Sequence, residues 1–210
     1  MNQFNIQQHF PLIAIIRGVT PDNCIQVAEI LIEEGFTMIE VPLNSPKALE
    51  SIQILVEKFG DEYLIGAGTV TTPDKAHAVI ETGAKLVVTP NVNQDVIRLA
   101  RSAGCVTFPG VVTPTEAFDA LEAGATGLKL FPVSSIGLDG FKALKDVLPA
   151  ETLCMPVGGV SAHKESLKPF VNLGANGFGL GSALYKPTMS LDEIRDNARA
   201  FVSAYKEAVA

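Results

Sequence analysis

The segment LIAIIRGVTPDNCIQVAEILIEEG, residues 12–35, opens with a short apolar run, passes through a turn and continues with apolar residues at helical spacing. A short β-branched and apolar run predicts a strand, and apolar residues three and four positions apart predict a helix after it. Gly35 ends the segment, where a left-handed residue would let the chain leave the helix. The segment therefore predicts one strand–helix unit.

The same unit recurs along the whole chain. Eight apolar runs are the predicted strands, at residues 12–18, 38–44, 64–70, 86–91, 105–111, 127–132, 153–159 and 177–183. Helical period predicts the helices between them, at residues 23–34, 46–58, 73–82, 93–102, 115–123, 140–147 and 166–173. Thr-Pro pairs at 20–21, 72–73 and 113–114 are expected to cap three of these helices.

Repeated units with wholly apolar strands predict an α/β fold, specifically a TIM (β/α)8 barrel whose parallel sheet is covered by helices. The alternative, an open doubly wound sheet, usually has fewer strands and a G-x-G-x-x-G turn after the first strand. Here that turn reads IIRGVTPDN. No Pro/Gly/Ser tract divides the 210 residues, so we expect a single domain over residues 1–210. In such a barrel the active site lies at the C-terminal ends of the strands.

The composition excludes several classes of partner. The net charge is −7, without a basic run and without tryptophan, which argues against nucleic acid and against an anionic membrane surface. No apolar stretch approaches the ~18 residues of a membrane span, and the first residues do not read as a signal peptide. Three widely spaced cysteines indicate neither disulfides nor zinc. We therefore expect a cytoplasmic protein that binds a small molecule.

Two charged residues stand inside predicted strands. Lys129 is flanked by leucines in GLKLFP, and Glu40 by isoleucine and valine in MIEVP. Burying an unpaired charge costs several kcal/mol, so this lysine and glutamate either form a structural ion pair or serve chemistry. A desolvated lysine amine can attack a carbonyl to form an imine, and a nearby glutamate can transfer protons. Strand alternation lets both side chains point into the barrel.

Other strand ends suggest how an anionic substrate is held. Arg17 ends the first predicted strand and could clamp a carboxylate, although a rim salt bridge is the alternative. The last two strands end in VGGV and GLGSAL, with Gly158, Gly159, Gly181 and Ser182. Exposed N–H groups in such turns match the usual phosphate site of these barrels, although glycine turns alone are weak signals. A lone hydroxyl, Thr69, is weaker still.

No metal site is expected. His9, His77 and His163 lie away from the strand ends and are interpreted as surface residues. The sequence contains neither H-x-H nor H-E-x-x-H spacing nor a cluster of acidic residues and histidines.

At these residues the chain resembles the bacterial 2-keto-3-deoxy-6-phosphogluconate and 2-dehydro-3-deoxy-6-phosphogalactonate aldolases, from Pro11 to about Tyr205. The motifs that carry the resemblance are IAIIRG, IEVPLNSP, GAGTV, VTPN, FPGVVTPTEA, GLKLFP, VGGV and GLGSALY. The resemblance implies a class I aldolase without metal or other cofactor, normally a homotrimer, that forms pyruvate and glyceraldehyde 3-phosphate from a keto-deoxy sugar-acid phosphate.

By position, the resemblance implies that Lys129 is the Schiff-base lysine and Glu40 the acid/base. Arg17 and Thr69 would hold the pyruvyl carboxylate, and Pro90 would line the pocket. The remaining implied residues are Phe131 beside the imine and Gly158, Gly159, Gly181 and Ser182 around the phosphate.

One departure bears on the substrate. The gluconate enzymes commonly have Thr-Gly-Gly where this chain has Val157-Gly158-Gly159, and some carry an arginine-containing turn where it has Asn44. Both features resemble the galactonate branch. We therefore predict a galactonate aldolase. The alternatives are the C4-epimeric gluconate as main substrate, another phosphate-binding barrel enzyme, and a non-catalytic sugar-phosphate-binding barrel.

Overall fold

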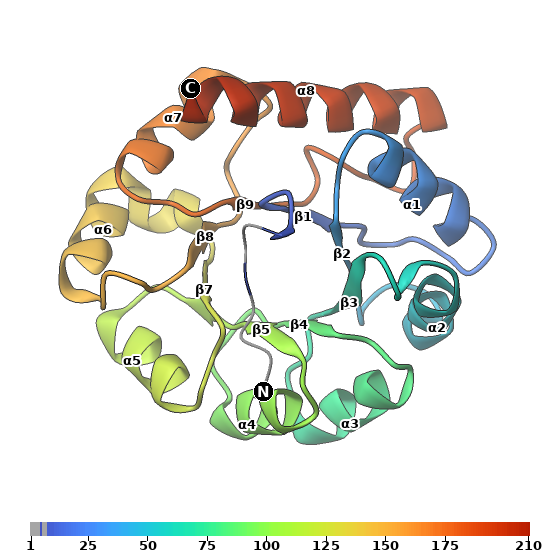
Figure 1. Cartoon of the computed structure of the whole chain (residues 1–210), viewed down its shortest axis with the longest axis horizontal. Coiled ribbons are helices and arrows are strands. Elements are labelled where there is room, and N and C mark those ends of the chain that lie inside the picture. The colour runs from blue at the N-terminus through green and yellow to red at the C-terminus, as the bar shows by residue number, and fades with distance from the viewer. Residues whose placement is uncertain (1–4, 6–7) are drawn as a thin grey trace.

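The computed structural model describes residue 5 and residues 8–210, which form an α/β fold. Figure 1 shows the strands gathered in the centre and the helices around them. The strands are β1 (Leu12–Ile15), β2 (Met38–Pro42), β3 (Leu64–Gly68), β4 (Leu86–Val88), β5 (Val106–Phe108), β6 (Gly110–Val111), β7 (Leu128–Leu130), β8 (Cys154–Pro156) and β9 (Phe178–Leu180). The helices are α1 (Cys24–Glu33), α2 (Ala48–Phe59), α3 (Pro73–Glu81), α4 (Gln94–Ser102), α5 (Pro114–Glu122), α6 (Val133–Val147), α7 (Lys164–Asn172) and α8 (Leu191–Val209).

The strands pair in parallel, as predicted, and form two hydrogen-bonded groups. Six strands follow the order β5-β4-β3-β2-β1-β9, and three follow the order β6-β7-β8. Together they make a curled parallel sheet with helices on its outer side (Figure 1).

Two prolines lie where the strand pairing is interrupted. Pro109 separates β5 from β6, which the sequence had predicted as one strand over 105–111. Pro156 ends β8, and an isolated bridge between Val157 and Gly179 joins that region to β9. Because proline has no backbone N–H, it can accept but not donate a sheet hydrogen bond. The sheet is therefore open at these points, whereas the predicted (β/α)8 barrel implies one continuous ladder.

The two faces of the strands belong to different apolar clusters. The smaller cluster consists of strand residues: Ile13, Met38, Leu64, Leu86, Val88, Val106, Phe108 and Met155. The larger cluster combines the alternate strand residues, such as Ile39 and Leu128, with residues of the helices. The smaller cluster therefore marks the inner face of the curled sheet. Lys129 and Glu40 alternate with residues of the larger cluster, so both point inward.

The helix ends agree with the prediction in part. Thr72 caps α3, and Thr113 forms a capping box with Glu116 on α5. Thr20, however, is not a cap: it lies in a turn in which its N–H and hydroxyl both donate to Asn23 Oδ1, and α1 begins after Asn23.

Two helices differ from their predicted extent. The helix predicted over 140–147 begins at Val133 and is broken at Gly137, whose φ is 63°. Helix α8 was not predicted, although Ser190 and Glu193 form a capping box at its start. Within the described residues, none of the helices combines the length and the apolar character that crossing a membrane requires.

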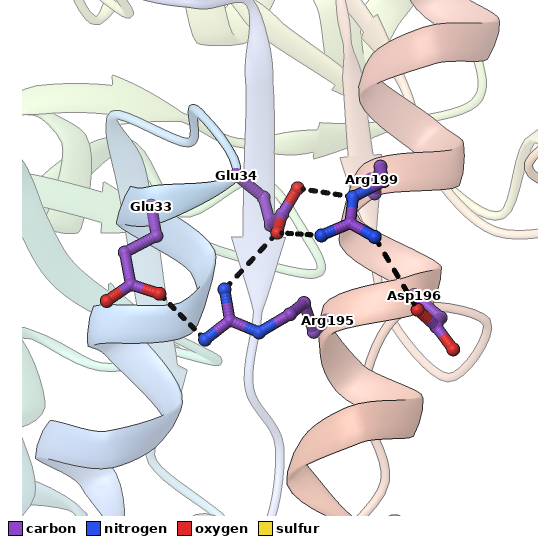
Figure 2. A network of polar contacts seen from close by, with 5 residues as sticks. All are labelled: Glu33, Glu34, Arg195, Asp196 and Arg199. Carbon is purple, nitrogen blue, oxygen red and sulfur yellow. Dashed lines mark hydrogen bonds and ion pairs between the residues drawn. The ribbon is translucent and has the colours of Figure 1, made fainter.

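A network of ion pairs joins the end of α1 to α8 (Figure 2). Arg199 donates two hydrogen bonds to Glu34, from Nε at 3.1 Å and from Nη2 at 2.8 Å. Arg195 contacts Glu33 at 2.7 Å and Glu34 at 3.3 Å. The Glu34 side chain is 12% exposed, and the hydrogen bond from Arg199 lowers its pKa below the ordinary 4.5, with Arg195 adding to the effect.

We expect Glu34→Gln to lower the free energy of unfolding by about 1 kcal/mol at neutral pH, the upper value for a partly exposed ion pair. Because the folded state lowers the pKa of Glu34, this contribution is present above pH 4.5 and is lost as the pH falls through the folded pKa. Urea unfolding at a series of pH values below 7 measures it, and the difference in the free energy of unfolding between the wild-type protein and the variant should shrink as the pH falls.

The matched control is Asp196→Asn, because Asp196 is 78% exposed and lies 3.9 Å from Arg199. It should change the unfolding curve less than Glu34→Gln at pH 7. Equal effects of the two variants would contradict the assignment of the stabilisation to Glu34.

Candidate active site

Lys129 lies in the middle of β7 and is 7% exposed. Its Nζ is 4.6 Å from the centre of the Phe131 ring, two residues further along the chain. Burial lowers the pKa of Lys129; the charge of Glu40 opposes this shift and the charge of Arg17 adds to it. The amine therefore gives up its proton more readily than that of a surface lysine, which favours nucleophilic attack.

Glu40 lies in the middle of β2 and is 1% exposed. Burial raises its pKa to about 7, against the opposing charges of Lys129 and Arg17. Within the described residues, its Oε2 has no hydrogen-bond partner. A carboxyl group with a pKa near 7 can both accept and release a proton at neutral pH, as an acid/base catalyst must.

Glu40 and Lys129 affect each other's pKa, yet in the described part of the chain they form no ion pair. The charge of each group still shifts the pKa of the other, so the two side chains lie close enough to interact.

Arg17 follows β1, in which Ile15 pairs with Glu40. Its Nη1 donates a hydrogen bond to Asn44 Oδ1, at the end of β2. Its charge contributes to the pKa values of both Glu40 and Lys129, so the guanidinium lies near both groups. The described residues give Arg17 this hydrogen bond and no salt bridge.

A cavity of about 420 Å³ brings most of the predicted residues together. Its lining includes Arg17, Lys129, Phe131, Val157, Gly158, Gly159, Gly181 and Ser182. Gly158 and Gly159 have φ of 84° and 92°, so this turn requires glycine. After β9, Gly181 O accepts hydrogen bonds from the N–H groups of Leu184 and Tyr185, so the chain makes a helical turn that begins at the cavity.

The cavity also has a cationic residue that the sequence analysis missed. Lys186 is exposed and belongs to the lining, together with Tyr185 and Pro187. Its place directly after GLGSALY, a predicted phosphate turn, is the signal that could have identified it.

Glu40, Thr69 and Pro90 do not belong to this lining. Thr69 and Pro90 follow strands on the same side of the sheet as Glu40. Thr69 comes directly after β3 and has a φ of 61°, a left-handed conformation that is unusual for a β-branched residue and typical of functional sites. Pro90 follows β4, and a side chain at Gly110, the strand partner of Lys129, would contact its carbonyl. Thr69 therefore follows the strand next to that of Glu40, and Pro90 lies next to β6, the neighbour of the Lys129 strand.

The three histidines were predicted to be surface residues, and one of them differs from this prediction. His77 and His163 are exposed, but His9 is half-buried, and burial lowers its pKa. Cys24, Cys105 and Cys154 are buried free thiols. Among the described residues, no three His, Cys, Asp or Glu side chains come together as a metal site.

An inward-facing amine, a carboxyl group with a pKa near 7 and a cavity with glycine turns are features typical of an enzyme active site. The model of the family "Aldolase: KDPG and KHG aldolase" matches residues 4–197. The chain belongs to this family and is a carbon–carbon lyase.

Individual relatives agree. The chain is 47% identical to the 2-dehydro-3-deoxy-6-phosphogalactonate aldolase of Escherichia coli (strain K12) over 97% of this chain and 98% of that one. Among solved structures, "Native KDPGal structure" is 47% identical, with a TM-score of 0.92 over 95% of this chain and 96% of that one. A designed protein cage built "by fusing symmetric oligomeric domains" has the same identity and TM-score over 95% of this chain and 73% of that one.

Proposed function

We propose that this protein is a class I aldolase that cleaves 2-dehydro-3-deoxy-6-phosphogalactonate into pyruvate and D-glyceraldehyde 3-phosphate, with Lys129 as its Schiff-base residue. The observation that carries the proposal is the buried Lys129 amine, facing a cavity and forming no ion pair within the described residues. The similarity to the Escherichia coli enzyme supports the choice of substrate.

The reaction begins when the deprotonated amine of Lys129 attacks the C2 ketone to form a carbinolamine. The carbinolamine takes up a proton from solvent and loses its C2 hydroxyl as water, which leaves a protonated imine. The imine draws the electron pair of the C3–C4 bond toward itself as this bond breaks. The resulting enamine is protonated at C3, and hydrolysis of the imine releases pyruvate and restores the lysine. The Phe131 ring, 4.6 Å from Nζ, can stabilise the positive charge of the imine.

Glu40 is assigned the proton transfers. As the C3–C4 bond breaks, its carboxylate accepts the proton of the C4 hydroxyl, directly or through a water, so that C4 becomes the aldehyde carbon of the first product. The same proton is then delivered to C3 of the enamine. A pKa of about 7 suits both steps.

The two ends of the substrate would be held by different parts of the site. Arg17 can pair with the carboxylate through two hydrogen bonds, with Thr69 and Pro90 on the neighbouring strand ends. At the other end, Gly158, Gly159, Gly181 and Ser182 would bind the phosphate through N–H groups and a hydroxyl.

The proposal extends to the architecture of the protein. We infer that the two groups of strands act as one (β/α)8 barrel, because Lys129 N donates to Pro109 O at 2.9 Å and Asn176 N to Cys154 O at 3.0 Å across the interruptions. We also propose assembly as a homotrimer; the similar designed cage, built from symmetric oligomeric domains, supports assembly as an oligomer. Cytoplasmic location is supported by the three free thiols.

The experiment that tests the function is cleavage of the two C4-epimeric substrates, each followed by pyruvate release. We expect the galactonate epimer to have the higher kcat/KM, by roughly 10-fold or more, since Val157 offers a methyl group where a hydroxyl would bind the other configuration. Val157→Thr is the informative variant and should shift the ratio toward the gluconate epimer. A wild-type preference for the gluconate would instead establish the alternative substrate, and cleavage of neither would refute the proposed function.

A further inference from the structure

We propose that Gly68 is a positioning residue for catalysis, because the absence of a side chain at this position provides the space that the Glu40 carboxylate occupies. The three atoms nearest to a Cβ built at position 68 are Oε1, Oε2 and Cδ of Glu40, all within 2.5 Å. Real Cβ contacts essentially never fall below 3.0 Å. The inference rests on the proposed function, in which Glu40 transfers protons.

The backbone conformation at position 68 does not explain why this residue is glycine. Gly68 ends β3, pairs with Pro42 and lies outside the left-handed residues of the chain, so that an alanine could adopt its conformation. Gly66, on the same face of the same strand, is different: a Cβ there would meet the backbone of Leu86. Gly66 therefore permits strand packing, whereas Gly68 accommodates one functional group.

A methyl group at position 68 would displace the carboxylate rather than the strand. Gly68 O accepts a hydrogen bond from Leu43 N at 2.8 Å, and Val70 N donates to Val88 O on the other side at 3.4 Å. The Glu40 carboxylate is the end of a flexible side chain, and its Oε2 has no hydrogen-bond partner in the described part of the chain. It must move by about 1 Å, a misplacement that can reduce a catalysed rate by about 10²-fold.

The test is a double-mutant cycle of Gly68→Ala and Glu40→Asp, with kcat and KM measured for cleavage. We expect Gly68→Ala to lower kcat by about 10²-fold with little change in KM. Glu40→Asp withdraws the carboxylate by one methylene group and is also slow. In the double variant the methyl group then has room, so the protein should be about as active as Glu40→Asp alone.

Gly66→Ala is the matched control, and its loss of stability should not be relieved by Glu40→Asp. Near-normal kcat in Gly68→Ala, or losses that simply multiply in the double variant, would overturn the inference. If Gly68→Ala unfolds, its stability is compared with that of the double variant: rescue by Glu40→Asp supports the contact, and no rescue refutes it. Failure of the proposed function is distinct, because the wild-type protein would then cleave neither epimer.

Discussion

Lys129→Met is expected to abolish both cleavage and covalent trapping of pyruvate. When pyruvate and borohydride are added to the wild-type protein, the imine should be reduced and leave a three-carbon unit on Lys129. Methionine fills a similar volume but has no amine, so the variant lacks the electron sink for the C3–C4 bond. Peptide mass mapping identifies the modified lysine, and pyruvate release measures cleavage.

Lys142 and Lys145 are the internal controls, because both lie on α6 outside the cavity lining. Trapping on either of them, or cleavage by the Lys129→Met protein, would remove the central claim. The variant should remain folded, since replacing a buried amine that forms no ion pair in the described structure leaves no orphaned partner. A structural pair would instead make both single variants less stable by ~3–5 kcal/mol.

Glu40→Gln is expected to lower kcat by roughly 10²- to 10⁴-fold, the usual contribution of a positioned acid/base group. Pyruvate trapping on Lys129 should persist, although more slowly, because glutamine preserves the shape of the pocket. In the wild-type protein, cleavage should rise as the pH passes through about 7, where Glu40 becomes the carboxylate that accepts the C4 proton. This limb of the pH–rate profile should be absent in the variant.

Stability gives an independent check on the same group. Burial raises the pKa of Glu40 from 4.5 to about 7, so the unfolded chain ionises first as the pH rises. Between pH 4.5 and about 7, the free energy of unfolding of the wild-type protein should therefore fall relative to that of Glu40→Gln. This difference should persist at higher pH. A well-folded Glu40→Gln protein with near-normal kcat would show that the proton is transferred by another group.

The sequence predicted the strands and the central pair well because both depend on local pattern. Each of the eight apolar runs contains a strand, and Lys129 and Glu40 are buried as their apolar neighbours indicated. Alternation along β2 and β7 placed each side chain on one face of its strand, and the structure shows that this face is the inner one. The glycine turns after β8 and β9 were found for the same reason, since they lie within a few residues of the strands they end.

The features that sequence reasoning missed depend on contacts between distant residues. That Gly68 makes room for Glu40 follows from the register of β2 with β3, which a single strand does not reveal. The strand pairing is interrupted at Pro109 and Pro156, and the sequence does not show which neighbouring strand each proline faces. Thr20 is of a residue type that is common at helix N-caps, but its hydroxyl donates a hydrogen bond to Asn23 Oδ1 instead. Helix α8 was not predicted, although the capping box of Ser190 and Glu193 at its start is visible in the sequence.

The pairing of β1 with β9 has a consequence for the order in which a newly made chain can fold. Among the described strands, β1 comes first along the chain and β9 last, and β1 has β2 and β9 as its two neighbours. Its helix α1 packs against α8, through the network of Figure 2. During synthesis, the edge of β1 that pairs with β9 therefore stays unpaired until β9 has emerged. The cavity that Arg17 lines is also lined by Leu180 of β9 and Phe201 of α8, so it is complete only once both of these elements have been made.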